Sequence, residues 1–173
     1  MAKVLINIDP HIELQKFLKE ILGQYEKNKI IYEKDIVLIK LYINNLDHKY
    51  YYTSYNIDDF FGHVNLFEIL IYFELYELAE DLLKFGFDIN HRNSPQDLTT
   101  FYNYINVHDE NDENIKVVQI MLKYEPIFEP INMYYNEGEE TYVYDPLNHL
   151  EEYKDKVPKT YKIIYDFINN NNK

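Results

Sequence analysis

Residues 65–90 read NLFEILIYFELYELAEDLLKFGFDIN, and this stretch carries the strongest structural signal in the chain. Apolar side chains recur every three to four residues over 65–73 and again over 76–85, which is the spacing of short amphipathic helices. Gly86 follows the second run directly, and glycine readily takes the left-handed conformation that ends a helix. The stretch therefore predicts two short helices and a tight exit at Gly86.

The same stretch resembles an ankyrin repeat, whose pattern runs from TPLH through two antiparallel helices to LLxxGADVN. The match is clearest in LLKFGFDIN, residues 82–90. The resemblance implies that the two leucines pack between neighbouring helices, and that Ile89 lies under the turn while Asp88 and Asn90 hydrogen-bond its backbone. Asn65-Leu66-Phe67-Glu68 replaces TPLH, so the hydrogen-bonding Thr and His of the family turn are missing in this copy.

Three further helix pairs carry weaker versions of the pattern. A helix over 10–25, begun by Asp9-Pro10, precedes DIVLIKLYINN (35–45). Thr99-Thr100-Phe101 opens a pair that VVQIMLKYEP (117–126) closes, with Glu125 at the position of the glycine and the acidic stretch 108–113 lengthening the turn between its helices. Asp145-Pro146-Leu147-Asn148 resembles TPLH and precedes KIIYDFINNN (162–171).

These patterns predict an all-α, ankyrin-like helical-repeat solenoid of about four helix pairs with long inter-repeat fingers. One domain is expected over 1–173, with 1–32 as the N-terminal cap helix and 33–170 as the repeats. Helices are expected over eight ranges: 10–25, 33–44, 65–73, 76–85, 100–107, 114–124, 145–153 and 158–169.

The charge balance is strongly acidic, with a formal net charge of −13 over 173 residues. Nucleic acids and anionic lipids require a basic patch, so the balance disfavours both and favours a basic protein partner. No signal peptide and no membrane-spanning stretch are visible, so a cytoplasmic location is expected. The chain has no cysteine, which excludes disulfides and thiolate chemistry.

Two long connections between helices are rich in tyrosine. KYYYTSYN (49–56) contains Tyr50, Tyr51, Tyr52 and Tyr55. NMYYNEGEETYVYD (132–145) contains Tyr134, Tyr135, Tyr142 and Tyr144, with Glu137-Gly138 as the expected tip of a hairpin. In an ankyrin repeat, the corresponding connections project as fingers beside the concave face. We therefore expect these tyrosines to bind a partner. The alternative is that the rings fold back and cover the bases of the loops.

Acidic residues concentrate in the second half of the chain. Residues 106–156 hold 13 Asp or Glu against 4 Lys. One group is Asp109, Glu110, Asp112 and Glu113, and a second is Glu137, Glu139, Glu140 and Asp145 in the neighbouring finger. The two groups are interpreted as one acidic patch that steers a basic partner. The alternative is an ordinary solvated face.

Patterns for metal, cofactor and catalytic sites are missing. The stretch 109–120 suggests a calcium loop, but Asn114 replaces the required glycine and Ile120 the required glutamate. The six histidines show no paired metal-ligand spacing, and there is no nucleophile elbow or phosphate loop. We therefore expect no catalytic residues, no cofactor and no metal.

The combination predicts a protein-binding module, specifically an acidic immunity or antitoxin-type inhibitor that occludes a basic toxin or nuclease. Electrostatic capture would precede contact with the tyrosines. One alternative is a viral or effector-type ankyrin adaptor that recruits host proteins. A second alternative is an enzyme with an unrecognised carboxylate site.

Overall fold

The computed structural model describes residues 9–53, 55, 64–92, 98–107, 110–135 and 140–171, with side chains described for all of these except 106–107, 131–135 and 140–142. The described chain is mostly helical, in agreement with the predicted all-α class. It divides into two compact units, Met1–Phe87 and Asp88–Lys173. Among the described residues, none of the helices has the length and apolar character that crossing a bilayer requires.

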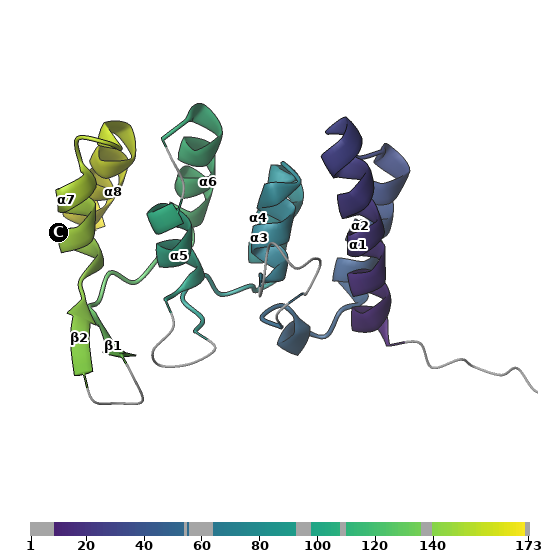
Figure 1. Ribbon diagram of the computed structural model, residues 1–173, viewed down its shortest axis with the longest axis horizontal. Helices are drawn as coiled ribbons and strands as arrows, with labels where there is room; N and C mark the ends of the chain where they lie inside the picture. Colours follow the sequence, from purple (N-terminus) through teal and green to yellow (C-terminus); the bar gives the residue numbers. More distant parts are fainter. Residues whose placement is uncertain are drawn as a thin grey trace, which may run out of the picture. The chain divides into compact units, whose positions relative to one another are not determined.

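The first unit is built from two helical hairpins. Helix α1 (Pro10–Asn28) packs against α2 (Glu33–Asn45), and α3 (Leu66–Tyr72) packs against α4 (Tyr76–Lys84), as Figure 1 shows. A short 3-10 helix, η1 (His48–Tyr50), begins the connection between the two hairpins. The core consists of apolar side chains at helical spacing, among them Leu14, Leu18, Ile21, Ile39, Ile43, Leu66, Phe67, Leu70, Ala79 and Leu82.

Helices α1 and α3 begin within one residue of the predicted start, where a polar side chain accepts hydrogen bonds from exposed backbone N–H groups. Helices α2 and α4 begin without a side-chain cap. Asp9 Oδ1 accepts from the backbone N–H of His11 at 3.0 Å, and Pro10 occupies the first turn of α1. At α3, Asn65 Oδ1 accepts from Glu68 N at 3.0 Å, and Glu68 Oε2 accepts from Asn65 N at 2.9 Å. This reciprocal capping box satisfies two backbone N–H groups at the start of α3.

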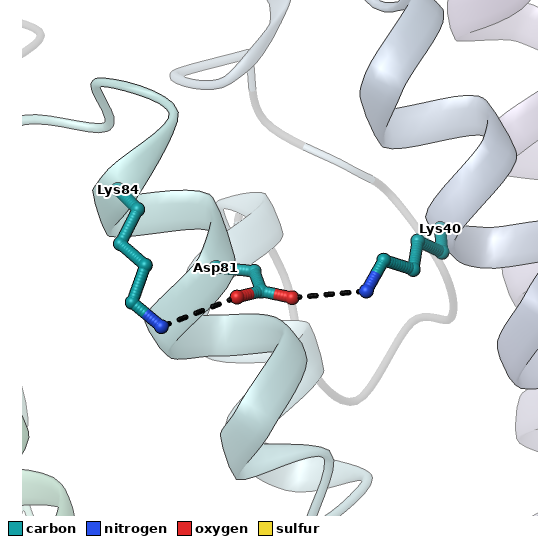
Figure 2. Close-up of polar contacts among 3 residues, drawn as sticks. All are labelled: Lys40, Asp81 and Lys84. Atoms are coloured by element: carbon teal, nitrogen blue, oxygen red, sulfur yellow. Dashed lines mark hydrogen bonds and ion pairs between the residues drawn. The ribbon is translucent and has the colours of Figure 1, made fainter.

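An ion pair joins the two hairpins of this unit. Asp81 on α4 lies between Lys40 of α2, at 3.2 Å, and Lys84 of its own helix, at 3.3 Å (Figure 2). Burial alone would raise the pKa of Asp81, but the hydrogen bonds and charges of the two lysines outweigh it and hold the pKa below its ordinary value. The carboxylate therefore stays ionised and connects α2 to α4.

The second unit contains four helices and one β-hairpin among its described residues. These are α5 (Thr100–Val107), α6 (Asp112–Leu122), β1 (Ile131–Tyr135), β2 (Glu140–Tyr144), α7 (Pro146–Tyr153) and α8 (Pro158–Asn171). The strands pair antiparallel, with Ile131 opposite Tyr144 and Tyr135 opposite Glu140. Helix α6 packs against both α5 and α8 around a core that includes Phe101, Tyr102, Tyr104, Val117, Val118, Met121 and Ile164.

Polar side chains also begin the helices of the second unit. Thr99 Oγ1 accepts from Tyr102 N at 3.2 Å, and Asp145 Oδ1 accepts from Leu147 N at 3.0 Å. Asn111 Oδ1 accepts from Asn114 N at 2.7 Å, so α6 begins at Asp112, two residues before the predicted start. The prediction that residues 108–113 belong to the turn between the helices is therefore wrong for residues 112 and 113, which lie in the first turn of α6.

Candidate binding surfaces

The tyrosine-rich connection of the first unit is packed against the fold. Tyr51 is 2% exposed and Tyr55 is 0% exposed. Burial is the main cause that raises the pKa of the Tyr55 hydroxyl, and the electrostatic effect of Tyr51 adds to it. The hydroxyl donates a hydrogen bond to the backbone oxygen of Tyr50 at 3.3 Å. For Tyr51 and Tyr55 the expectation that the rings are buried mainly in a complex is wrong, because folding already removes them from water.

The other two rings of this connection are half-buried against neighbouring elements. Tyr50 stacks on His11 of α1, with ring centroids 4.7 Å apart and planes 8° apart. Tyr52 lies 5.2 Å from the ring of Phe87, directly after α4. The connection therefore contacts the start of α1 and the exit of α4, and part of each ring still reaches the surface.

Gly86 allows this close packing. Its φ of 101° is a left-handed value that side chains disfavour, as predicted for the helix exit. A Cβ at this position would lie 3.4 Å from Cε1 of His48, the first residue of η1. The glycine thus serves both the backbone turn and the contact with the tyrosine-rich connection.

The second tyrosine-rich connection forms the β-hairpin. Tyr134 and Tyr135 lie in β1, and Glu140 and Tyr142 lie in β2, and the side chains of these four residues lie outside the described part. Glu137 and Glu139, at the expected tip, also lie outside the described residues. At the base of the hairpin, the Tyr144 ring contacts Tyr102 at 6.2 Å and His149 at 5.5 Å.

The predicted acidic turn contains one carboxylate with a structural role. Glu110 Oε2 accepts from the backbone N–H groups of Lys159 at 2.7 Å and Thr160 at 3.0 Å. These N–H groups lie in the first turn of α8, where the helix itself offers no acceptor, and a carboxylate there also interacts favourably with the helix dipole. Glu110 is therefore a cap supplied from another part of the chain. Asp109 lies outside the described residues.

The described members of the two predicted acidic groups lie on different elements. Asp112 and Glu113 form the first turn of α6, whereas the chain reaches the hairpin only after the last turn of α6, at Leu122. Figure 1 shows the hairpin and the start of α6 at opposite ends of this helix. The 11 residues of α6 span ~16 Å. Asp109, Glu137 and Glu139 lie outside the described residues, so the single acidic patch stays a prediction.

An ion pair connects the start of α6 with the start of α8. Asp112 Oδ1 lies 3.6 Å from Nζ of Lys159, so the start of α6 lies beside the start of α8 and the turn that precedes it. Glu152 and Asp155, both exposed, lie at the end of α7 and in that turn. We call Asp112, Glu113, Glu152 and Asp155 the acidic end. No local pattern relates the two segments, since they are about 40 residues apart in the chain.

Asn90 also has a larger role than the sequence indicates. Its backbone N–H donates to Asp88 Oδ1 at 2.8 Å, as the resemblance implies. Its side chain then reaches the exit of α6, where Nδ2 donates to Glu125 O at 3.2 Å and Oδ1 accepts from Ile127 N at 2.8 Å. Glu125 itself has a φ of 53°, a left-handed conformation that glycine adopts more readily than other residues.

Within the described residues, no three His, Asp or Glu side chains are grouped closely enough to hold a metal ion. No protein-family model matches the chain, and the comparisons with curated proteins and with solved structures give no match either.

Proposed function

We propose that this chain is an ankyrin-like protein-binding module that inhibits a basic protein, in the manner of an immunity protein or antitoxin. The acidic end is the observation that carries the proposal. Four exposed carboxylates, of Asp112, Glu113, Glu152 and Asp155, lie in the first turn of α6, at the end of α7 and in the turn before α8, in a chain whose net charge is −13. Lys154, Lys156 and Lys159 lie in the same segments, and Lys159 pairs with Asp112. Such a surface accelerates the approach of a basic partner and opposes its lysines and arginines with carboxylates.

The repeat architecture is supported by three features of the helix pairs. The described helices follow one another as pairs. The exits of α4 and α6 both contain a left-handed residue, Gly86 and Glu125. Asn90, four residues after Gly86, hydrogen-bonds to Glu125 and Ile127. This is the pattern expected when successive connections of a repeat pack on one another.

The proposed role of the tyrosines is narrower than the sequence suggests. Tyr51 and Tyr55 belong to the core. Tyr50 and Tyr52 retain a partly exposed edge and can add contact area for a partner at the first unit.

The experiment compares binding of the wild type and of two charge variants to a basic protein encoded beside this gene. One variant carries Asp112→Asn, Glu113→Gln, Glu152→Gln and Asp155→Asn. The control variant neutralises the same number of exposed carboxylates elsewhere, with Glu20→Gln, Glu26→Gln, Glu77→Gln and Asp166→Asn. Association rates are measured by biolayer interferometry at about 50 and about 300 mM salt.

We expect the first variant to associate at least about tenfold more slowly than the control variant at the lower salt concentration, and its rate to depend less on salt. Equal effects of the two variants would show that net charge alone matters. Equal binding of a non-cognate basic protein such as lysozyme would show non-specific attraction, and either result would contradict the proposal.

A further inference from the structure

One face of α2 exposes apolar side chains that the fold leaves uncovered. Val37 is 53% exposed, Leu38 42% and Leu41 52%. These residues and Lys34 are spaced i, i+3, i+4 and i+7, so they lie together on one face of the helix. The opposite face, with Asp35, Ile39 and Ile43, is buried in the first unit.

The chemistry of this face argues against a basic partner. Lys34 is the only charged residue among the four, and its Nζ lies 5.7 Å from the centroid of the Tyr32 ring. Tyr32 directly precedes α2 and is itself 50% exposed, so its ring extends the apolar surface at the start of the helix. A partner for this surface must therefore offer mainly apolar contact.

The distribution of charge favours a second copy of this chain. Residues 10–46, which include α1 and α2, hold six Lys against five Asp or Glu, whereas the rest of the chain holds 25 Asp or Glu against 11 Lys or Arg. Two copies that approach elsewhere bring acidic surfaces together, and two copies that meet at the first helix pair do not. The first helix pair is thus where self-association meets the least repulsion.

We propose that the face formed by Lys34, Val37, Leu38 and Leu41 is the contact surface of a two-fold symmetric homodimer, in which two antiparallel α2 helices cross at Leu38. In this arrangement Leu38 of one chain contacts Leu38 of the other, and Leu41 of each chain packs beside the methylene groups of Lys34 of the other chain. The two Lys34 residues are separated by ~12 Å along the helix axis, about one Debye length, so their repulsion is weak. Because two-fold contacts close, no open filament forms.

The contact is small, since each copy contributes three apolar side chains from α2. We therefore expect weak association, with a dissociation constant on the order of 100 µM. Sedimentation of the full chain from about 10 µM to about 1 mM should show a monomer–dimer equilibrium. The triple variant Val37→Gln, Leu38→Gln and Leu41→Gln should stay monomeric. A matched control, Ile127→Gln, Val143→Gln and Tyr165→Gln, alters three similarly exposed side chains and should dimerise like the wild type.

A cysteine experiment tests the two-fold centre directly, because the chain contains no cysteine of its own. Under mild oxidation, Leu38→Cys should form disulfide dimers at least about tenfold faster than Val143→Cys, although the side chain at position 143 is the more exposed of the two. Equal crosslinking rates would overturn the proposal. So would a wild type that remains monomeric throughout, a triple variant that still dimerises, or association that continues beyond the dimer.

Discussion

The hydroxyl of Tyr25, on α1, donates a hydrogen bond to Oε1 of Glu74, in the turn between α3 and α4, at 2.9 Å. The ring also contacts Phe73 at 5.4 Å, so Tyr25 joins the two hairpins of the first unit. Burial, then the hydrogen bond and the charge of Glu74, raise the pKa of Tyr25 to about 12.

This pKa predicts a loss of stability at alkaline pH. A group whose pKa is raised by folding stabilises the protein fully below its unfolded pKa, here about 10, and this contribution disappears as pH rises through about 12. We expect the difference in free energy of unfolding between the wild type and Tyr25→Phe to be constant up to about pH 10 and to narrow above it. Urea unfolding at several pH values measures this difference. If the difference in free energy of unfolding between the two proteins stayed constant up to about pH 11.5, the raised pKa of Tyr25 would be contradicted.

The ion pair of Asp81 predicts the opposite pH dependence. Its lowered pKa stabilises the fold above the unfolded pKa, and this contribution is lost as pH falls through the folded pKa. We expect Asp81→Asn to lower the free energy of unfolding by less than about 1 kcal/mol at pH 7, because the pair is partly exposed. Urea unfolding at neutral and acidic pH measures the loss. The difference in free energy of unfolding between wild type and Asp81→Asn should disappear at acidic pH. At neutral pH, Lys40→Gln should lower the free energy of unfolding by part of the amount that Asp81→Asn does.

Glu110 and Glu113 should respond differently to the same substitution. Glu110→Ala removes the cap of α8 and should cost about 0.5–2 kcal/mol of stability. Glu113→Ala removes the same charge from an exposed position and should cost less than about 0.5 kcal/mol. Thermal and urea unfolding of the two variants provide the comparison, and equal losses would show that Glu110 does not act as a cap.

The helix exits provide a pair of opposite substitutions. Glu125→Gly should stabilise the protein by up to about 1 kcal/mol, because glycine adopts the observed φ of 53° without strain. Gly86→Val should destabilise it by about 1 kcal/mol or more, because a β-branched residue resists a φ of 101° and its Cβ meets His48. Glu125→Ala, which keeps the strain, is the control for the first change, and chemical unfolding measures all three.

The four tyrosines of the first connection should divide into two groups. Tyr55→Ala and Tyr51→Ala remove buried rings and should each cost about 3–5 kcal/mol of stability. Tyr50→Ala and Tyr52→Ala remove half-buried rings and should cost distinctly less, so that any effect of these two on partner binding is measurable in folded protein. Thermal melts beside a binding assay separate the groups. Equal losses at all four positions would contradict the observed packing.

Local sequence determined where α1, α3 and α7 begin and where α4 ends. Asp9-Pro10, Asn65 with Glu68, Asp145 and Gly86 act within a few residues of the backbone groups that they serve, so their effect is visible in the sequence. Apolar spacing likewise determined which face of each helix is buried. The all-α class follows from these local signals alone.

Only the tertiary structure decided which side chains remain at the surface. Tyr51 and Tyr55 are buried because their connection folds back onto the start of α1 and the exit of α4, which is a contact between distant segments. Glu110 caps a helix that begins about 50 residues later in the chain. The physical reason is the range of the interactions: caps act over a few residues, whereas burial and charge grouping depend on how whole helices pack.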